Sequence, residues 1–217
     1  MRTQQTYGVD IAMTRADDLD KKMLVDVAKQ VQAGYAPSVL DLGCGGGGQS
    51  ARLAAVGALV VGVDIDDHTA TFSALRATQG LLEGSMEFRL GDISKLAVVL
   101  EDQKFDAVCL QRVLHYVPYT TALLLLCDLR ARTPLGGKLY CAVTGLESAI
   151  GREYQDADKS VVDRFCRLSA SDAETFSIAQ ALCLYTPEEF IVLLQDSGWE
   201  IEECWVSAFG NIKVVCR

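Results

Sequence analysis

The sequence predicts an α/β protein, a three-layer sandwich around a seven-stranded, mostly parallel sheet that ends in an antiparallel hairpin. Strand signals alternate with helix signals through about the first two thirds of the chain, which implies parallel strands with right-handed crossovers. Two strand signals then follow the last helix with only a short link between them, as in a hairpin. The chain has 217 residues and is 50% hydrophobic, which suits a single domain over 1–217 with a large buried core.

An amphipathic helix is expected near the N-terminus. Four apolar residues recur at four-residue intervals and form one stripe: Leu19, Met23, Val27 and Val31. Gly34 and Pro37 end this pattern, because glycine and proline both stop helices. We therefore expect residues 1–36 to form an N-terminal cap helix ahead of the first strand.

Strand and helix signals alternate after this cap. Short apolar runs, several of them β-branched, predict strands at 39–42, 59–65, 86–90, 106–110 and 138–143. Helix patterns lie between them at 51–56, 69–82 and 121–132. Because parallel neighbours need crossover connections, this order predicts helices on both faces of one sheet.

The C-terminal part of the chain departs from this alternation. Thr186-Pro187-Glu188-Glu189 is a capping box with proline at the first helical position, and Gly198 ends the helix that it begins. Strand signals follow at 199–206 and 211–215, joined by a short glycine-containing link. These two strands bring the sheet to seven.

Residues 145–185 form a stretch of mixed charge that the alternating scheme does not need. We interpret this stretch as an insertion after the fifth strand. Ligands of open α/β sheets bind outside the carboxyl ends of the strands, so an insertion leaving from that end can fold over a ligand as a lid. A helix pair that only completes the surface explains the stretch equally well.

Composition excludes several classes of function. The 20 lysines and arginines stand against 29 aspartates and glutamates, and this net charge of −9 is the opposite of what nucleic-acid binding favours. The strongest apolar run, 122–127, is too short to cross a bilayer, and the first 15 residues hold no stretch of signal-peptide length. The eight cysteines are dispersed without a CxxC pair, so we expect free thiols in a cytoplasmic protein and no metal site.

A glycine-rich loop lies between the first predicted strand and its helix, at Asp41-Leu42-Gly43-Cys44-Gly45-Gly46-Gly47-Gly48. Backbone without side chains at this place lets ligand atoms approach closely, as in nucleotide sites. Gly43, Gly45 and Gly48 match GxGxxG, whereas Gly43, Gly45 and Gly47 match GxGxG. The loop alone does not choose between a dinucleotide and another adenosine-containing ligand.

Two acids follow the loop at the ends of predicted strands. Asp64 ends the second strand about 20 residues further on, where a carboxylate accepts hydrogen bonds from ribose hydroxyls. Asp92 ends the third strand, at the same edge of the sheet. An acid that simply faces solvent at the end of a strand would explain Asp64 by itself. It would not explain why the glycine loop, the spacing of about 20 residues and the strand end occur together.

Five segments carry a family resemblance: residues 39–50 (VLDLGCGGGGQS), 63–65 (VDI), 91–93 (GDI), 105–108 (FDAV) and 134–139 (PLGGKL). Together they resemble the class I S-adenosylmethionine-dependent methyltransferases, over about residues 39–217. The resemblance implies a Rossmann-like fold. Leu110-Gln111-Arg112-Val113 stands where amine-methylating DNA and protein enzymes of this kind carry Asn-Pro-Pro-Tyr/Phe, which favours a small-molecule acceptor.

The resemblance also implies roles for single residues. The methionine portion of the cofactor would be held by Asp41, Gly43, Cys44, Gly45 and Gly47. Asp64, followed by Ile65, would take the ribose hydroxyls, and Asp92 with the Ile93 backbone would meet the adenine edge. Gln111, after the fourth strand, resembles the family position that closes over the methionine end. The family often has Pro-Gly-Gly where this chain has Pro134-Leu135-Gly136-Gly137, a shifted turn.

His115 is the candidate catalytic residue, because it follows the fourth strand at the carboxyl edge where an acceptor would meet the methyl group. It would act as a general base on a hydroxyl or ammonium acceptor. The alternative is a histidine that lines the pocket passively. Tyr116, Tyr119 and Tyr154 are candidates for an aromatic wall around the acceptor, although packing explains them as well.

Three functions remain open from the sequence. The leading one is an S-adenosylmethionine-dependent methyltransferase that transfers a methyl group to a small molecule by in-line displacement, as a monomer or a homodimer. The second is an NAD(P)-dependent oxidoreductase, which the GxGxxG interpretation of Gly48 favours. The third is a non-catalytic module that binds S-adenosylmethionine.

Overall fold

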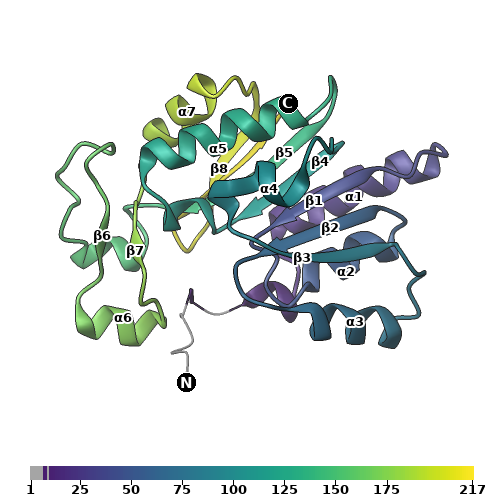
Figure 1. Ribbon diagram of the computed structural model, residues 1–217. Helices are drawn as coiled ribbons and strands as arrows, with labels where there is room; N and C mark the ends of the chain where they lie inside the picture. The colour runs from purple at the N-terminus through teal and green to yellow at the C-terminus, as the bar shows by residue number, and fades with distance from the viewer. Residues whose placement is uncertain (1–6, 9) are drawn as a thin grey trace.

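The computed structural model describes residues 7, 8 and 10–217 and confirms the predicted fold class. Its main sheet has seven strands in the order β3-β2-β1-β4-β5-β9-β8 (Figure 1). The strands are β1 (Ser38–Leu42), β2 (Leu59–Asp64), β3 (Met86–Leu90), β4 (Ala107–Gln111), β5 (Lys138–Thr144), β8 (Ile201–Val206) and β9 (Asn211–Cys216). The first five are parallel, and β9 pairs antiparallel with both β5 and β8.

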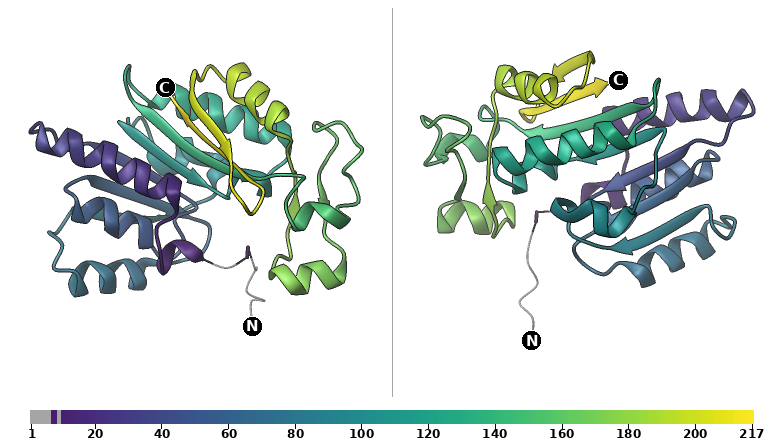
Figure 2. Two further views of the ribbon diagram at one scale, coloured as in Figure 1. Left: turned by 180° about the vertical axis from the view of Figure 1, so that it is seen from behind. Right: turned by 45° about the horizontal axis from the view of Figure 1, so that its top comes forward.

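Helices cover both faces of this sheet (Figures 1 and 2). One face carries α1 (Asp18–Gln32), α2 (Gly48–Ala55) and α3 (Thr69–Thr78). The other carries α4 (Leu96–Leu100), α5 (Tyr119–Arg132) and α7 (Pro187–Asp196). Two hydrophobic cores result, one on each side of the sheet. In β1, for example, Val39 packs into one core and Leu40 into the other, as expected for a strand buried on both faces.

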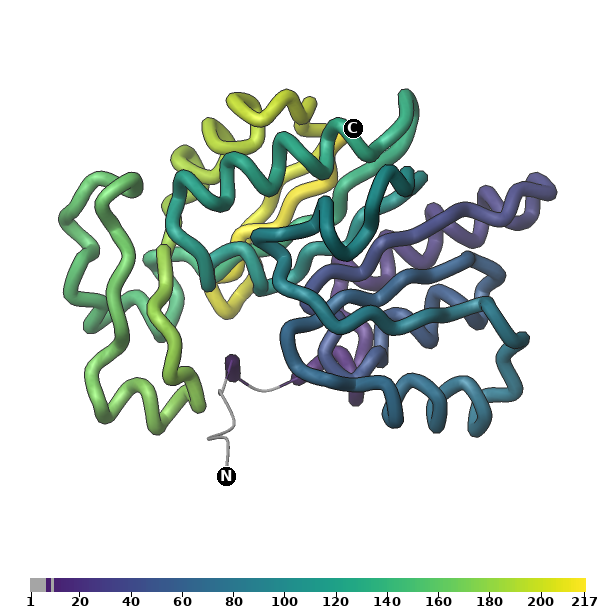
Figure 3. Tube along the Cα trace, in the orientation of Figure 1, coloured from purple at the N-terminus to yellow at the C-terminus, as the bar shows by residue number. Residues whose placement is uncertain are grey.

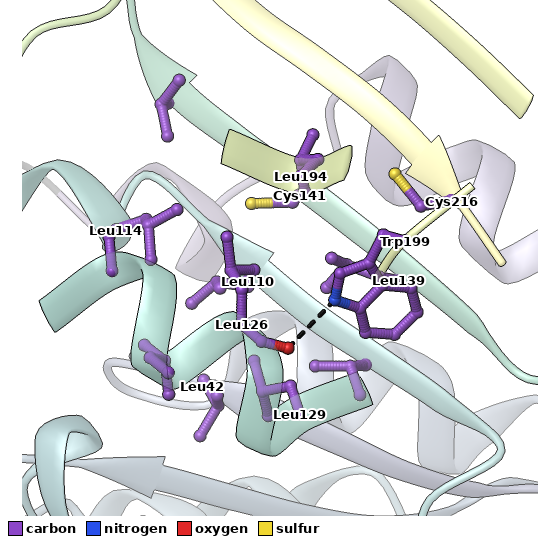
Figure 4. Packing of buried hydrophobic residues seen from close by; sticks show 14 of the residues in the cluster. Leu42, Leu110, Leu114, Leu126, Leu129, Leu139, Cys141, Leu194, Trp199 and Cys216 are labelled. Atoms are coloured by element: carbon purple, nitrogen blue, oxygen red, sulfur yellow. Dashed lines mark hydrogen bonds between the residues drawn. The ribbon is translucent and has the colours of Figure 1, made fainter. Parts of the chain in front are cut away.

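The larger core lies between the sheet and the helices α5 and α7. Figure 4 shows Leu110 of β4 and Leu126 of α5 among its members. Trp199 is also buried there, and its indole nitrogen donates a hydrogen bond of 3.1 Å to the Leu126 carbonyl (Figure 4). The sequence predicted a strand from residue 199, but β8 begins only at Ile201 because Trp199 turns into this core.

Element boundaries differ from the prediction at other places. The helix predicted to reach residue 82 ends at Thr78, and Gly80 follows with a φ of +64°. The sequence pattern did not predict α4, whose five residues are too few to establish a helical period. The strands β4, β5 and β9 each continue one residue beyond the predicted end, to Gln111, Thr144 and Cys216.

The insertion 145–185 contains β6 (Cys166–Arg167), α6 (Ala170–Phe176) and β7 (Ala181–Leu182), at one end of the main sheet (Figures 1 and 2). It has a small hydrophobic cluster of its own, around Tyr154, Ile178, Leu182 and Leu184. The buried Arg164 ties it to α7, because its guanidinium donates to both carboxylate oxygens of Glu189, at 2.6 and 3.0 Å. Within the described residues, no helix is both long and apolar enough to cross a membrane.

Candidate cofactor and acceptor site

A cavity of about 1370 Å³ opens at the carboxyl ends of the parallel strands. Residues at four strand ends, and one residue just beyond a fifth, line it: Leu42, Asp64, Gln111 and Thr144, with Asp92 two positions after the end of β3. The topology requires this meeting, because the carboxyl ends of parallel strands share one edge of the sheet. Nine of the ten residues predicted to hold the cofactor line this cavity: Asp41, Gly43, Cys44, Gly45, Asp64, Ile65, Asp92, Ile93 and Gln111.

The glycine loop between β1 and α2 has a left-handed backbone at Gly43, Gly45 and Gly47, with φ values of +64°, +50° and +88°. Such values favour glycine because a Cβ atom would strain them. A Cβ at Gly45 would also lie 2.4 Å from an Asp10 carboxylate oxygen. Gly47 does not line the cavity. A Cβ there would lie 2.5 Å from the Phe72 ring, so the loop needs this glycine for packing.

Asp64 lies at the tip of β2 and holds the glycine loop. Its Oδ2 accepts a hydrogen bond of 2.9 Å from the Gly45 amide, and its Oδ1 accepts one of 3.0 Å from the Asp66 amide. His68, at the N-cap position of α3, also lines the cavity, and its Nε2 lies 4.0 Å from the same Oδ1. The Asp64 carboxylate is therefore held in one orientation, facing the cavity.

Asp92 stands one strand further along. It caps the short 3-10 helix Ile93–Lys95, and its Oδ1 accepts hydrogen bonds from the amide and the hydroxyl of Ser94, at 2.9 and 2.8 Å. Its carboxylate and Ile93 both line the cavity next to Asp64. Two carboxylates are thus fixed at neighbouring strand tips.

Two buried acids form the floor of the cavity. The Ser50 hydroxyl donates to Asp41 in β1 at 2.6 Å. Burial raises the pKa of Asp41 to about 7, despite this hydrogen bond. Burial also raises the pKa of Asp20 in α1, which accepts hydrogen bonds from the Asp17 amide and from the side-chain amide of Gln111. The hydrogen bond to Asp20 therefore fixes the orientation of the Gln111 side chain.

An N-terminal strap, residues 7, 8 and 10–15, lies between the glycine loop and the insertion (Figure 3). Six of its residues line the cavity: Tyr7, Gly8, Asp10, Ile11, Ala12 and Arg15. At one end, the Asp10 carboxylate accepts a hydrogen bond of 2.9 Å from the Gly46 amide. At the other end, the Gly8 amide donates to the Ser177 carbonyl at 2.9 Å, and the Tyr116 hydroxyl donates to the Tyr7 carbonyl at 2.6 Å. No sequence pattern marks Asp10, because nothing local distinguishes a residue that acts on a loop 36 positions away.

His115 lies on the other side of the cavity, beyond β4. It is buried, and its Nδ1 accepts a hydrogen bond of 3.3 Å from the Thr144 amide. Burial lowers the pKa of His115 to about 3, and the charge of Arg112 acts in the same direction. The imidazole is therefore neutral at pH 7, with its proton on Nε2, since Nδ1 is an acceptor. In this state His115 offers the cavity a hydrogen-bond donor.

The predicted aromatic wall is present only in part. Tyr116 lines the cavity, with its ring centroid 4.4 Å from that of His115. Tyr154 is buried in the cluster of the insertion, where its hydroxyl donates to the Leu182 carbonyl, and Tyr119 packs against the larger core. Neither reaches the cavity, so both are removed from the candidate site. Phe209 and Asn211, from the turn between β8 and β9 and the start of β9, line this side instead.

Comparisons with known proteins agree with this geometry. A family profile described as a methyltransferase domain matches residues 40–140. The ubiquinone biosynthesis O-methyltransferase of Xanthomonas oryzae pv. oryzae is 31% identical over 122 residues, which are 54% of this chain and 49% of that protein. A mitochondrial ubiquinone biosynthesis O-methyltransferase of Arabidopsis thaliana is 38% identical over 78 residues, 36% of this chain and 24% of that protein. The chain thus spans about half the length, or less, of these relatives.

Solved structures show the same fold. An S-adenosylmethionine-dependent methyltransferase of Clostridium acetobutylicum superposes with a TM-score of 0.68 at 14% identity, over 95% of this chain and 94% of that one. The 1,6-didemethyltoxoflavin-N1-methyltransferase of Burkholderia thailandensis, solved with S-adenosylhomocysteine bound, gives 0.66 at 16% identity, over 93% and 78%. The strand order and the glycine loop with acids after the following strands agree with these comparisons: residues 40–140 are similar to a methyltransferase domain, and the fold is that of the solved S-adenosylmethionine-dependent methyltransferase.

Proposed function

We propose that this protein is an enzyme that methylates a small molecule, taking the methyl group from S-adenosylmethionine by in-line displacement. One observation carries the proposal. The glycine loop and the carboxylates of Asp41, Asp64 and Asp92 surround one half of a cavity, which continues past His115 into space for an acceptor. A chain whose cofactor half and acceptor half share one cavity can hold two reactants in line, which is the main contribution of protein to such a reaction.

The residues of the cofactor half fit this cofactor. When bound, S-adenosylmethionine supplies an activated methyl group on a positively charged sulfonium. Asp10, Asp20 and Asp41 give this half an excess of negative charge, which complements a cation. We assign Asp64 to the ribose hydroxyls and Asp92 with the Ile93 backbone to the adenine edge. The loop 43–47, Asp41 and Gln111 are assigned to the methionine portion.

His115 is proposed to act on the acceptor through Nε2. The hydrogen bond from the Thr144 amide to Nδ1 favours the tautomer in which Nε2 donates, so His115 can orient an acceptor oxygen or nitrogen. A role as general base stays a prediction, and it needs the other tautomer, which loses the bond from Thr144. Tyr116 is proposed to pack against the same acceptor.

Further features belong to the proposal. We infer that the chain is a single domain in which the insertion 145–185, held to α7 by Arg164, covers the acceptor as a lid. All eight cysteines are free thiols, which supports a reducing compartment such as the cytoplasm. A monomer or a homodimer is compatible with this assignment, since one chain supplies the whole cavity lining described above.

S-adenosylhomocysteine is expected to raise the melting temperature of the protein, whereas NAD⁺ is not. At ten times its Kd, a ligand that binds only the folded state adds about 1.4 kcal/mol to the free energy of unfolding. Differential scanning fluorimetry with S-adenosylmethionine, S-adenosylhomocysteine, NAD⁺ and NADP⁺ at equal concentrations measures this. Stabilisation by a dinucleotide alone would favour the oxidoreductase. Stabilisation by S-adenosylhomocysteine without turnover of any acceptor would favour the non-catalytic module.

Cofactor binding is expected to depend on pH through Asp41. The folded pKa of about 7 lies above the ordinary value, so this carboxyl holds its proton more tightly in the folded protein than in the unfolded chain. Its contribution to stability therefore falls as the pH rises from about 4 to 7. A cationic ligand favours the carboxylate, so S-adenosylhomocysteine, through its ammonium group, should bind about tenfold more weakly at pH 6 than at pH 8.

Isothermal titration calorimetry tests this pH dependence. Repeating the titration at pH 6 in two buffers of different ionisation enthalpy should show that a proton is released on binding. Asp41→Asn keeps the shape of the side chain and should make the affinity nearly independent of pH between 6 and 8. An unchanged pH profile in folded Asp41→Asn would assign the effect to another group.

A further inference from the structure

Arg112 lines the cavity and has an unusual backbone conformation. It follows β4 directly, and its φ is +57°, in the left-handed region that residues other than glycine rarely adopt. Its amide donates to the Ala142 carbonyl at 2.7 Å, so the strained conformation is held by the neighbouring strand β5. Backbone strain of this kind concentrates at functional sites. Here it places an arginine at the junction between the cofactor half and the acceptor half.

The guanidinium of Arg112 forms no ion pair in the part of the chain that the structure describes, although its charge opposes the rise that burial causes in the pKa of Asp20. Its Nε is buried without a hydrogen bond, and none of the ion pairs within residues 7, 8 and 10–217 includes it. The buried Arg132 and Arg164 differ, because each pairs with a carboxylate, Asp128 and Glu189 respectively. An arginine that lines a cavity with unused donors is suited to an anion from outside the chain.

The charges around the cavity are divided between its two halves. On the side of the glycine loop and of β1 to β3, the exposed Arg15 of the strap stands against six carboxylates, so this half is net negative: Asp10, Asp20, Asp41, Asp64, Asp66 and Asp92. Beyond β4, Arg112 lies beside His115, and Arg152 lines the wall formed by the insertion. The carboxylate on this second side is Glu147, whose side chain is exposed. A cation therefore fits the first half and an anion fits the second.

We propose that the methyl acceptor carries a carboxylate, that Arg112 binds this carboxylate, and that the Nε2–H of His115 donates a second hydrogen bond to the acceptor. This inference rests on the proposed methyl transfer and names its substrate class. A guanidinium beside a neutral imidazole donor forms planar, charge-assisted hydrogen bonds with a carboxylate. A neutral amide of the same shape does not form charge-assisted bonds with them. The methionine portion of the cofactor also carries a carboxylate, so the experiment must separate the two sources.

The test measures binding to the protein saturated with S-adenosylhomocysteine. Benzoate and succinate are titrated against benzamide and succinamide, their neutral counterparts, at constant ionic strength and followed by the melting temperature. In the wild type we expect each acid to stabilise the complex more than its amide does. In Arg112→Gln this difference should disappear, with at least a tenfold loss in acid affinity, and Arg112→Lys should retain part of it. The matched control is Arg167→Gln, an exposed arginine outside the cavity, which should behave as the wild type.

Other outcomes overturn the inference. Equal stabilisation by acids and amides in the wild type would do so without any variant, even if Arg112→Gln did not fold. A difference that persists in Arg112→Gln would remove Arg112 from the site. If Arg112→Gln instead weakens S-adenosylhomocysteine tenfold and leaves the acid difference intact, the guanidinium serves the cofactor and not the acceptor. If S-adenosylhomocysteine does not stabilise the wild type, the proposed function itself fails, and the inference with it.

Discussion

Asp64→Ala is expected to weaken the binding of S-adenosylhomocysteine by about 1.5–3 kcal/mol, which is roughly a tenfold to more than a hundredfold rise in Kd. The carboxylate at the tip of β2 is assigned to two ribose hydroxyls, and charge-assisted hydrogen bonds are the strong ones. The same carboxylate accepts from the Gly45 amide at 2.9 Å, so its loss also releases the glycine loop. Calorimetric titration at pH 8 gives the change in Kd.

Asp102→Ala is the matched control for this variant. Asp102 is exposed and follows α4, away from the residues that line the cavity. Its substitution should leave the Kd unchanged. A folded Asp64→Ala protein with an affinity within twofold of the wild type would contradict the placement of the ribose, because the alanine cannot replace either hydrogen bond.

Leu110→Ala is expected to lower the free energy of unfolding by about 2–5 kcal/mol. Leu110 lies in β4, the central strand of the sheet, and its side chain is fully buried between the sheet and α5. The truncation removes three carbon atoms from a core that packs on them from several sides, and the cavity left behind adds to the lost burial. Urea unfolding followed by circular dichroism measures the change.

Leu124→Ala provides the comparison, since Leu124 has the same side chain but lies on the solvent side of α5, 71% exposed. Its effect should stay within about 0.5 kcal/mol. If the two variants were equally stable, the layer between the sheet and α5 would not be the core described above. The difference between them therefore tests the packing independently of any ligand.

The sequence predicted the sheet and most of its helices because their signals are local. The central strands are mostly apolar, with Asp41 inside β1 as an exception. The capping box at Thr186 marks the start of α7, where the Thr186 hydroxyl and the Glu189 carboxylate exchange hydrogen bonds with backbone amides as expected. The glycine loop and the acids after it were found for the same reason: strand ends are visible in the chain. Their meeting at one cavity follows from the parallel topology.

Other parts of the site could not be found in this way. The contact of Asp10 with Gly46 depends on how the strap folds back, and no periodicity records it. Tyr154 and Tyr116 look alike in the sequence, yet one fills the small cluster of the insertion and the other lines the cavity. The buried Nε of Arg112, which has no hydrogen bond, can be recognised only once the neighbouring side chains are placed in space. Long-range packing, and not local chemistry, decides all three.

The reversed direction of β9 has a consequence for how acceptor preference can diverge. Because β9 is antiparallel to β5, its first residue, Asn211, pairs with Thr144 at the cavity edge, and the tight bend just before it delivers Phe209. The cofactor half is built from other segments, on the far side of β4. Changes in the length or residues of that bend can therefore alter the proposed acceptor pocket without changing the residues assigned to the cofactor. Substrate choice can then vary, in evolution or by engineering, independently of cofactor binding.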